Sequence, residues 1–577
     1  MIGFGATPVI YAQRTAVEAE RAIVTSVHFL ASEAGVEILK KGGNAVDAAA
    51  ATAFALSVVY PYAGALGSGG FMLVHLADGR DVVIDYRETA PSSASRDMYL
   101  GPDGNVISGP GSSTLGWRAS GVPGMVAGFA LAQQRYGSGK VSWSDVLEPA
   151  RRLAAEGHTV TPYTASLFKL SGAKLSQFAE SKRVFLAAGA FLKPGELWRQ
   201  PDLAATLTRL QKNGPREFYE GETAKKISDA MAQNQGTIAL ADLKAYRAVE
   251  RQPLRGSYRG HDVVTMPPPS SGGIALLQML GMLEPFDVAE LGPNSAAKYH
   301  LFTEAMRRAF RDRAEYLGDP DFVKIPVAGL LDRTYLARLM KNFDPAKATA
   351  SEGLAPGNPA GWEPIKLTEV SNLRAQLAAE STETTHFSIV DSGGNAVSNT
   401  YTLNGAFGSG VTIPGTGIIM NNEMDDFTSK IGVKNMFGLL QGPANSIAPG
   451  KRPLSAMTPT FVLKNGALVL VTGSPGGPTI INTVLEIITN VIDHAMPVQL
   501  AVDFPRFHHQ WIPDELVFDR YSFSPDTMAI LAAKGHHLKE RPNVIVGDGE
   551  TIAIDPKTKL LQGAADLRKP DSRAVGY

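Results

Sequence analysis

The chain has 577 residues, 44% of them hydrophobic and 19% charged, which is ample for a large core in one big domain or several. Its formal net charge of −1 gives no overall field that favours nucleic acid or an anionic membrane surface. The absence of cysteine excludes disulfides, thiolate zinc sites, iron–sulfur clusters and cysteine nucleophiles.

The first 13 residues are a weak targeting signal. They are mildly apolar and end in a small-residue context at Ala12 but lack a basic n-region, so they fit either the remnant of a signal peptide or a frayed first strand. The longest apolar run, residues 45–59, is interrupted by Asp47 and falls short of the ~18 residues that span a bilayer. We therefore expect a soluble mature protein with no membrane span.

A buried strand leading into a helix is predicted for residues 22–31, and an alanine-rich helix follows over residues 45–59, capped by Asn44. Because alanine lies on all sides of that helix, we expect close packing all round it. Residues 64–70 are rich in glycine and stand between this helix and an apolar strand. A phosphate-binding loop has the opposite order, so we interpret the segment as close backbone packing, with nucleotide binding as the alternative.

Arg87 lies where an alternating strand gives way to a proline-containing loop, a place where scaffolds often present binding groups. From the local sequence alone, a surface ion pair is the favoured explanation of this arginine. Residues 122–330 are mostly helical in pattern, and the charges on the helix after Asn294 recur at solvent-face spacing. Residues 346–382 have no firm period, which predicts a long mobile loop running into Thr384.

The most informative stretch is residues 380–404, which predicts two strands joined by a Ser-Gly-Gly turn. A three-residue loop about Gly393 places Thr384 opposite Thr402, on one face and within hydroxyl reach. A register shifted by one residue would instead bring Leu403 opposite Thr384. Because cross-strand threonine pairs are common in sheets, this pairing alone does not assign a function.

Residues 473–477, Gly-Ser-Pro-Gly-Gly, end a predicted strand and open a helix. Backbone amides at the start of a helix make a natural site for an anion or an oxyanion. His508 and His509 are adjacent and point to different faces, so we interpret them as structural rather than as a metal pair.

Several motifs in a fixed order resemble the γ-glutamyltransferase family, from Ala22 to the C-terminus. They are LASEAGVEILKKGGNAVDAA, DYRETAP, PPPSSGG, RAEYLGDPDF, ESTETTHFSIVD, NTYTLN, NNEMDDF, KRPLSAM, TGSPGG and PRFHHQW. The resemblance implies an α/β protein of the α+β type with an N-terminal-nucleophile hydrolase fold, an αββα four-layer sandwich. It also implies one precursor that cuts itself into a large subunit, residues 14–383, and a small subunit, residues 384–577, interleaved in one domain.

By this resemblance the cut falls between Glu383 and Thr384, and Thr384 becomes the nucleophile. A freed α-amine with a pKa of ~7.7–8.0 then serves as the general base of the same residue. Thr402 resembles the threonine that orients the nucleophile, whereas alternation turns Thr385 to the other face. No metal, cofactor or Ser-His-Asp triad is required.

The resemblance also assigns the groups that meet a γ-glutamyl donor. Arg87 resembles the clamp for the donor's α-carboxylate, because its fork of donors suits a planar anion. Gly476 and Gly477 match the amide pair that stabilises the tetrahedral oxyanion, a contribution of about 3–4 kcal/mol per donor. Glu423 and Asp426 resemble the residues that hold the donor's ammonium, and Asn404 contributes to the same pocket. Ser455 resembles a serine near the donor's carboxylate.

Two positions depart from the family pattern. Ala456 stands where the family has a second serine, which should weaken donor binding by about 1 kcal/mol. Phe437, in the lid-like loop of residues 428–452, stands where the family commonly has tyrosine and cannot donate a hydrogen bond to Asn404. Both changes bear on specificity for γ-glutamyl donors and leave self-cleavage untouched.

The implied reaction is cleavage of glutathione-like donors through a γ-glutamyl–Thr384 ester that passes to water or to an amino-acid or peptide acceptor. The alternatives are a cephalosporin (glutaryl) acylase-like amidase and an unprocessed binding protein. Glu423 and Asp426 argue against a glutaryl donor, because two acids would repel a donor that has no positive charge. The resemblance implies a periplasmic or secreted protein with no nucleic-acid partner.

Overall fold

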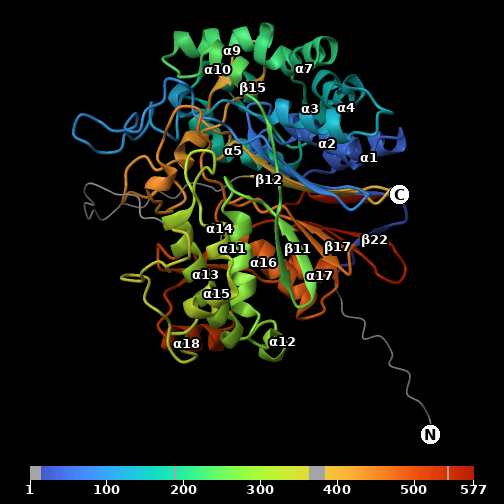
Figure 1. Ribbon diagram of the computed structural model, residues 1–577. Coiled ribbons are helices and arrows are strands. Elements are labelled where there is room, and N and C mark those ends of the chain that lie inside the picture. The colour runs from blue at the N-terminus through green and yellow to red at the C-terminus, as the bar shows by residue number, and fades with distance from the viewer. Residues whose placement is uncertain (1–13, 188–189, 363–383, 542–544) are drawn as a thin grey trace.

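The computed structural model describes residues 14–187, 190–362, 384–541 and 545–577. Two seven-stranded sheets pack face to face in the middle of the molecule, and helices cover both outer faces (Figure 1). The predicted αββα four-layer sandwich is therefore confirmed. No helix in the described part of the chain is long and apolar enough to cross a membrane.

The sheet that carries the hairpin of residues 385–402 has all neighbouring strands antiparallel. Its strands are, in spatial order, β23 (Arg573–Gly576), β2 (Ile23–Ser26), β12 (Thr385–Val390), β13 (Ala396–Thr402), β3 (Gly69–His75), β4 (Asp81–Asp85) and β9 (Val249–Arg251). The strands of the facing sheet are β1 (Val17–Ala19), β22 (Leu561–Ala565), β21 (Glu550–Ile554), β17 (Ala467–Thr472), β16 (Thr460–Lys464), β11 (His261–Thr265) and β10 (Leu254–Tyr258). Strands from before and after residue 384 thus mix in both sheets.

Helices from the first half of the chain cover the hairpin sheet (Figure 1). They include α1 (Phe29–Lys40), α2 (Ala45–Val59), α3 (Met125–Tyr136), α4 (Trp143–Glu156), α5 (Pro162–Leu175), α7 (Pro201–Asn213), α9 (Glu222–Gln233) and α10 (Leu240–Ala245). The facing sheet is covered by helices that include α11 (Gly272–Leu283), α13 (Ala296–Tyr316), α15 (Arg333–Leu339), α16 (Thr479–Ile492), α17 (Val498–Asp503) and α18 (Pro525–Ala533). Apolar residues of both sheets fill the space between them.

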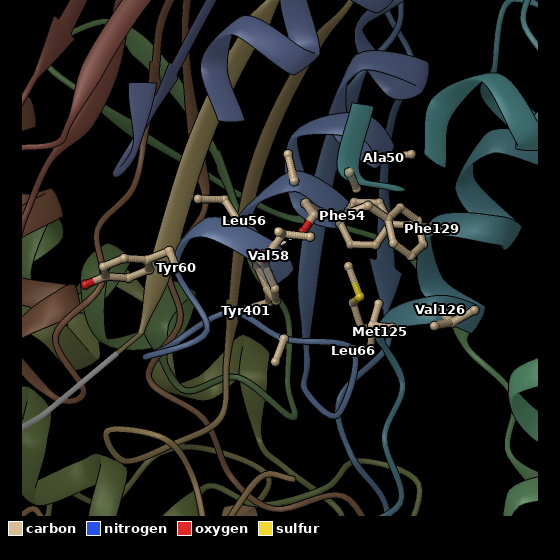
Figure 2. Packing of buried hydrophobic residues seen from close by; sticks show 14 of the residues in the cluster. Ala50, Phe54, Leu56, Val58, Tyr60, Leu66, Met125, Val126, Phe129 and Tyr401 are labelled. Atoms are coloured by element: carbon tan, nitrogen blue, oxygen red, sulfur yellow. Dashed lines mark hydrogen bonds between the residues drawn. The ribbon is translucent and has the colours of Figure 1, made fainter. Parts of the chain in front are cut away.

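The alanine-rich helix α2 is buried along its whole length, as predicted. Asn44 caps it and Asp47 completes a reciprocal capping box, which satisfies two amides of the first turn. Figure 2 shows Phe54 of α2 beside Phe129 of α3, with their ring centroids 6.2 Å apart. The hydroxyl of Tyr401, on β13, donates to the carbonyl of Ala53 at 3.0 Å, so α2 and the hairpin are directly joined.

The glycine-rich segment of residues 64–70 runs into β3 in the middle of the hairpin sheet. A Cβ atom at Gly67 would lie 2.1 Å from the carbonyl oxygen of Ile419, and one at Gly70 would lie 2.4 Å from that of Thr400. The interpretation as close backbone packing is confirmed, because these glycines leave no room even for a methyl group.

One prediction about the helices was wrong. The charges of α13 do not face solvent: its buried charged residues are Lys298, Glu304, Arg307, Arg308, Asp312 and Arg313. Glu304 accepts a hydrogen bond from the amide of Thr349 at 3.0 Å, and Asp312 accepts one from Gly357 at 2.9 Å. The polar face of α13 therefore binds the backbone of the irregular segment that follows it, residues 346–362. The rest of the predicted loop lies outside the described residues.

We expect Gly70→Ala to destabilise the protein by at least about 1–3 kcal/mol, because its methyl group meets backbone atoms that cannot move aside. The thermal unfolding midpoint, compared with that of wild type, measures the effect. Gly393→Ala, whose methyl group would meet only side chains at 3.2 Å or more, is the matched control. An unfolding midpoint of Gly70→Ala equal to that of the control would contradict the packing argument.

Candidate active site

The predicted hairpin register is confirmed. Strands β12 and β13 pair with Thr385 opposite Tyr401 and His386 opposite Thr400, so Thr384, just before β12, lies opposite Thr402. The Thr384 and Thr402 side-chain oxygens are 3.3 Å apart. Both threonines are buried, and both line a small cavity of 20 Å³.

This cavity brings together most of the residues singled out in the sequence. From that set it is lined by Arg87, Thr384, Thr402, Asn404, Glu423, Asp426, Phe437, Ser455, Ala456 and Gly477. Gly476 is not among the lining residues but immediately precedes Gly477. Arg313 of α13 also lines the cavity, and sequence reasoning missed it. Its motif, RAEYLGDPDF, belonged to the resemblance, but the charges of this helix were assigned to solvent.

The guanidinium of Arg87 is fully buried and surrounded by acids. It forms an ion pair with Glu423, donates to Asp426 Oδ2 at 2.5 Å, and lies 3.8 Å from Glu88 Oε2. Its remaining donors reach the carbonyls of Pro453 and Leu454 at 3.3 and 3.4 Å. Three carboxyl groups therefore surround one guanidinium, and Arg87 is not the surface arginine that the local sequence favoured.

Burial dominates the protonation of two of these acids, Glu88 and Glu423. Loss of hydration raises the pKa of Glu88 to about 8 and raises the pKa of Glu423 well above its ordinary value, although Arg87 opposes both shifts. The neighbouring carboxylates repel one another and add to the increase. A positively charged group entering the cavity would favour the ionised forms.

Asn404 occupies a left-handed backbone conformation, with φ 78°, directly after the hairpin. Its amide nitrogen donates to the carbonyl of Asn422 at 3.1 Å and contacts the sulfur of Met436 at 3.7 Å. Phe437 lines the cavity but has no group that could hydrogen-bond Asn404. The contact between the loop 428–452 and Asn404 comes instead from the sulfur of the adjacent Met436. Sequence reasoning did not identify Met436, since a thioether carries no distinctive local signal.

Gly477, in the glycine loop between β17 and α16, lines the same cavity as Thr384. Gly476 and Gly477 have φ values of 128° and 57°, a region that side chains rarely adopt. His386 supports the start of this loop: its ring leaves no room for a Cβ at Gly473 and hydrogen-bonds the Thr400 hydroxyl at 2.7 Å. Burial lowers the pKa of His386 to about 3, so the ring is neutral.

Ser455 is held by backbone contacts. Its carbonyl accepts hydrogen bonds from the amide and hydroxyl of Ser271 at 2.8 and 2.6 Å. The hydroxyl of Ser455 accepts from the amide of Met457 at 3.1 Å, and Ala456 beside it adds only a methyl group to the cavity. The cavity wall is therefore less polar here than two serines would make it.

The raised pKa of Glu88 predicts a pH-dependent stability. A carboxyl group whose folded pKa exceeds its unfolded value contributes stability below the unfolded pKa of ~4.3, and this contribution is lost as the pH rises toward about 8. The stability of Glu88→Gln relative to wild type should therefore increase between pH 5 and 8, by on the order of a few kcal/mol. Thermal unfolding across this range is the measurement, with the exposed Glu33→Gln as the control. A constant difference between Glu88→Gln and wild type would contradict the assignment.

Comparison with known proteins finds relatives that match nearly the whole chain. The family model described as Gamma-glutamyltranspeptidase matches residues 31–576. The chain is 45% identical over 564 residues to the glutathione hydrolase proenzyme of Escherichia coli (strain K12), covering 97% of this chain and 93% of that one. It is 38% identical over 556 residues to the Acylase ACY 1 proenzyme of Pseudomonas sp. (strain V22), covering 95% and 92%.

Solved structures agree with the fold. Cephalosporin acylase from Bacillus halodurans superposes with a TM-score of 0.83 at 26% identity, covering 100% of this chain and 99% of that one. Helicobacter pylori gamma-glutamyltranspeptidase superposes with a TM-score of 0.57 at 38% identity, covering 62% of this chain and 100% of that one. With a family model matched along nearly its whole length, this chain belongs to the γ-glutamyltranspeptidase family.

Proposed function

We propose that this protein is a self-cleaving γ-glutamyltransferase that removes the γ-glutamyl group from glutathione-like donors and passes it to water or to an amino-acid or peptide acceptor. The observation that carries the proposal is the 3.3 Å contact between the hydroxyls of Thr384 and Thr402. Both residues line a cavity that Arg87, Glu423 and Asp426 also line, and the chain belongs to the γ-glutamyltranspeptidase family. The 45% identical proenzymes carry the name glutathione hydrolase, which supports the donor class.

Self-cleavage is the first step of the proposal. The hydroxyl oxygen of Thr384 attacks the carbonyl carbon of residue 383, the peptide C–N bond breaks as an ester forms, and water then hydrolyses this ester. The products are a large subunit ending at residue 383 and a small subunit beginning with Thr384. The new α-amine, with a pKa of ~7.7–8.0, remains partly unprotonated near neutral pH and can act as a base.

Acyl transfer uses the same hydroxyl. The α-amine takes the proton of Thr384 Oγ1 while this oxygen attacks the γ-carbonyl carbon of the donor, and Thr402 orients it. The amides of the Gly476–Gly477 loop stabilise the oxyanion. The protonated amine then returns its proton to the leaving amine, leaving a γ-glutamyl ester on Thr384. Water or an acceptor amine attacks the ester and restores the enzyme.

Charge favours a donor with an ammonium group. Glu423 and Asp426 lie on either side of the Arg87 guanidinium, and Glu88 adds a third acid to the cluster. We assign the donor's ammonium to Glu423 and Asp426, with Asn404 beside them. We assign its α-carboxylate to Arg87 and Ser455. A glutaryl donor, which lacks the ammonium, would gain nothing from these acids.

We also propose that the enzyme works in the periplasm or outside the cell. The inference depends on the bacterial relatives and on the apolar start of the chain, which lies outside the described residues.

The intact masses of wild type and Thr384→Ala test self-cleavage. Wild type should give two fragments that meet between Glu383 and Thr384, and the variant one uncut chain, because it lacks the attacking hydroxyl. Thr385→Ala is the matched control, since Thr385 lies on the opposite face of β12, against Gly64, and should cut normally. An uncut wild-type chain, stable for days, would point instead to a binding protein.

The second prediction separates a γ-glutamyl donor from a glutaryl donor. Asp426→Asn removes a charge that faces the donor's ammonium, so we expect KM for γ-glutamyl-p-nitroanilide to rise about 10- to 100-fold. Steady-state kinetics with glutaryl-p-nitroanilide, which lacks the ammonium, should show no comparable loss. Faster turnover of the glutaryl anilide by wild type would favour the acylase alternative, and equal losses on both donors would contradict the ammonium assignment.

A further inference from the structure

The peptide bond between Gly476 and Gly477 is held through its carbonyl group. The oxygen of Gly476 accepts two hydrogen bonds from Thr479, one from the side-chain hydroxyl at 2.8 Å and one from the backbone amide at 3.2 Å. Thr479 is the first residue of α16 and is only 6% exposed, so water has little access to these bonds. The direction of the Gly476 carbonyl is therefore set by a single residue of the helix that follows the glycine loop.

The N–H group of the same peptide bond points the other way. In a trans peptide the C=O and N–H bonds are antiparallel, so a carbonyl held against the start of α16 turns the amide of Gly477 away from that helix. None of the described residues accepts a hydrogen bond from this amide. Gly477 lines the same cavity as Thr384. An amide without an acceptor at this wall is suited to bind an oxyanion.

A peptide bond between two glycines needs such an anchor. Gly476 and Gly477 both have positive φ values, 128° and 57°, and neither carries a Cβ atom that would restrict rotation of the peptide plane. Turning this plane over would exchange the directions of its C=O and N–H groups and would break both hydrogen bonds to Thr479. A Cβ atom at Gly476 would lie 2.4 Å from Thr479 Oγ1, so the hydroxyl packs directly against this glycine.

We propose that Thr479 is a positioning residue for acyl transfer: its hydroxyl holds the carbonyl of Gly476 and thereby aims the amide of Gly477 at the oxyanion. The inference rests on the proposed function, in which this glycine loop stabilises the oxyanion, and adds the group that keeps the amide in place. Thr479 is not among the described residues that line the cavity, so it acts through the loop and not on the donor. Its effect belongs to the tetrahedral intermediate, where negative charge develops on the oxygen.

Substitutions of Thr479 that keep or remove its hydroxyl test this role. Thr479→Val preserves the shape of the side chain and loses the hydroxyl, whereas Thr479→Ser retains the hydroxyl. The matched control is Thr483→Val, the same substitution one turn further along α16, at a buried threonine whose hydroxyl has no hydrogen-bond partner among the described residues. Steady-state kinetics of fully cut protein are measured with γ-glutamyl-p-nitroanilide.

In Thr479→Val we expect kcat to fall at least about 10-fold, toward the ~100- to 1,000-fold loss that follows removal of an oxyanion donor, with KM unchanged. Thr479→Ser and Thr483→Val should stay close to wild type. The fall in kcat with an unchanged KM separates this role from a general loss of donor binding.

A second readout compares glutamate with its analogue in which a boronic acid replaces the γ-carboxyl group. Boron accepts the Thr384 hydroxyl oxygen, whose proton passes to the α-amine, and the tetrahedral adduct mimics the reaction intermediate. Thr479→Val should therefore weaken inhibition by the boronic acid at least about 10-fold more than inhibition by glutamate.

Equal kcat values for Thr479→Val and Thr483→Val would overturn the inference, as would equal losses in Thr479→Ser and Thr479→Val. A rise in KM without a fall in kcat, or equal weakening of both inhibitors, would place the effect in donor binding and also overturn it. A Thr479→Val chain that stays uncut would assign the hydroxyl to folding or self-cleavage, and the proposed role would fall. In failure of the proposed function, by contrast, wild type itself releases no nitroaniline from the γ-glutamyl donor.

Discussion

The site depends on the pairing of β12 with β13 in the middle of a seven-stranded sheet. The carboxylate of Asp391, at the turn, accepts a hydrogen bond from the amide of Ala45, the first residue of α2, at 2.8 Å. At the other end of the hairpin, Tyr401 donates to Ala53 of the same helix. A shift of one residue would turn Thr384 away from Thr402. Two contacts with one buried helix therefore hold the register on which the contact between Thr384 and Thr402 depends.

The second constraint is the burial of charged groups in the cavity that Thr384 lines. Ionised groups in a dry cavity are expensive unless they pair, and breaking one pair leaves an uncompensated charge. The cluster around Arg87 has more acids than guanidinium groups, and burial raises the pKa values of Glu88 and Glu423 in response. These raised pKa values favour a ligand that brings a positive charge to the acids. Arg313 also lines the cavity, and its Nη1 has no hydrogen-bond partner among the described residues. A zwitterionic donor head suits these charges better than a simple dicarboxylic acid.

Local patterns predicted the elements that depend on short-range physics. The turn chemistry around Gly393 and strand alternation were enough to pair Thr384 with Thr402, because the hairpin closes over a few residues. The cap at Asn44 and the all-round alanine pattern of α2 were equally readable. The spacing of charges on α13, however, led to the wrong prediction that they face solvent. Such spacing shows which face of a helix is polar but not what covers that face. Part of that face is covered by residues 346–362, whose backbone amides donate hydrogen bonds to Glu304 and Asp312.

By itself, then, the sequence determined the hairpin register, the glycine positions that allow close packing and, through the order of its motifs, the αββα fold. The tertiary structure alone decided which distant groups share the cavity and in what state. Ordinary local sequence surrounds Arg313 of α13, Met436 of the loop 428–452, and Glu88 after β4. These residues reach the cavity or its neighbours only because the fold buries them beside partners far along the chain. Pairing and pKa depend on distances of a few ångströms between such segments, and spacing along the chain does not encode those distances.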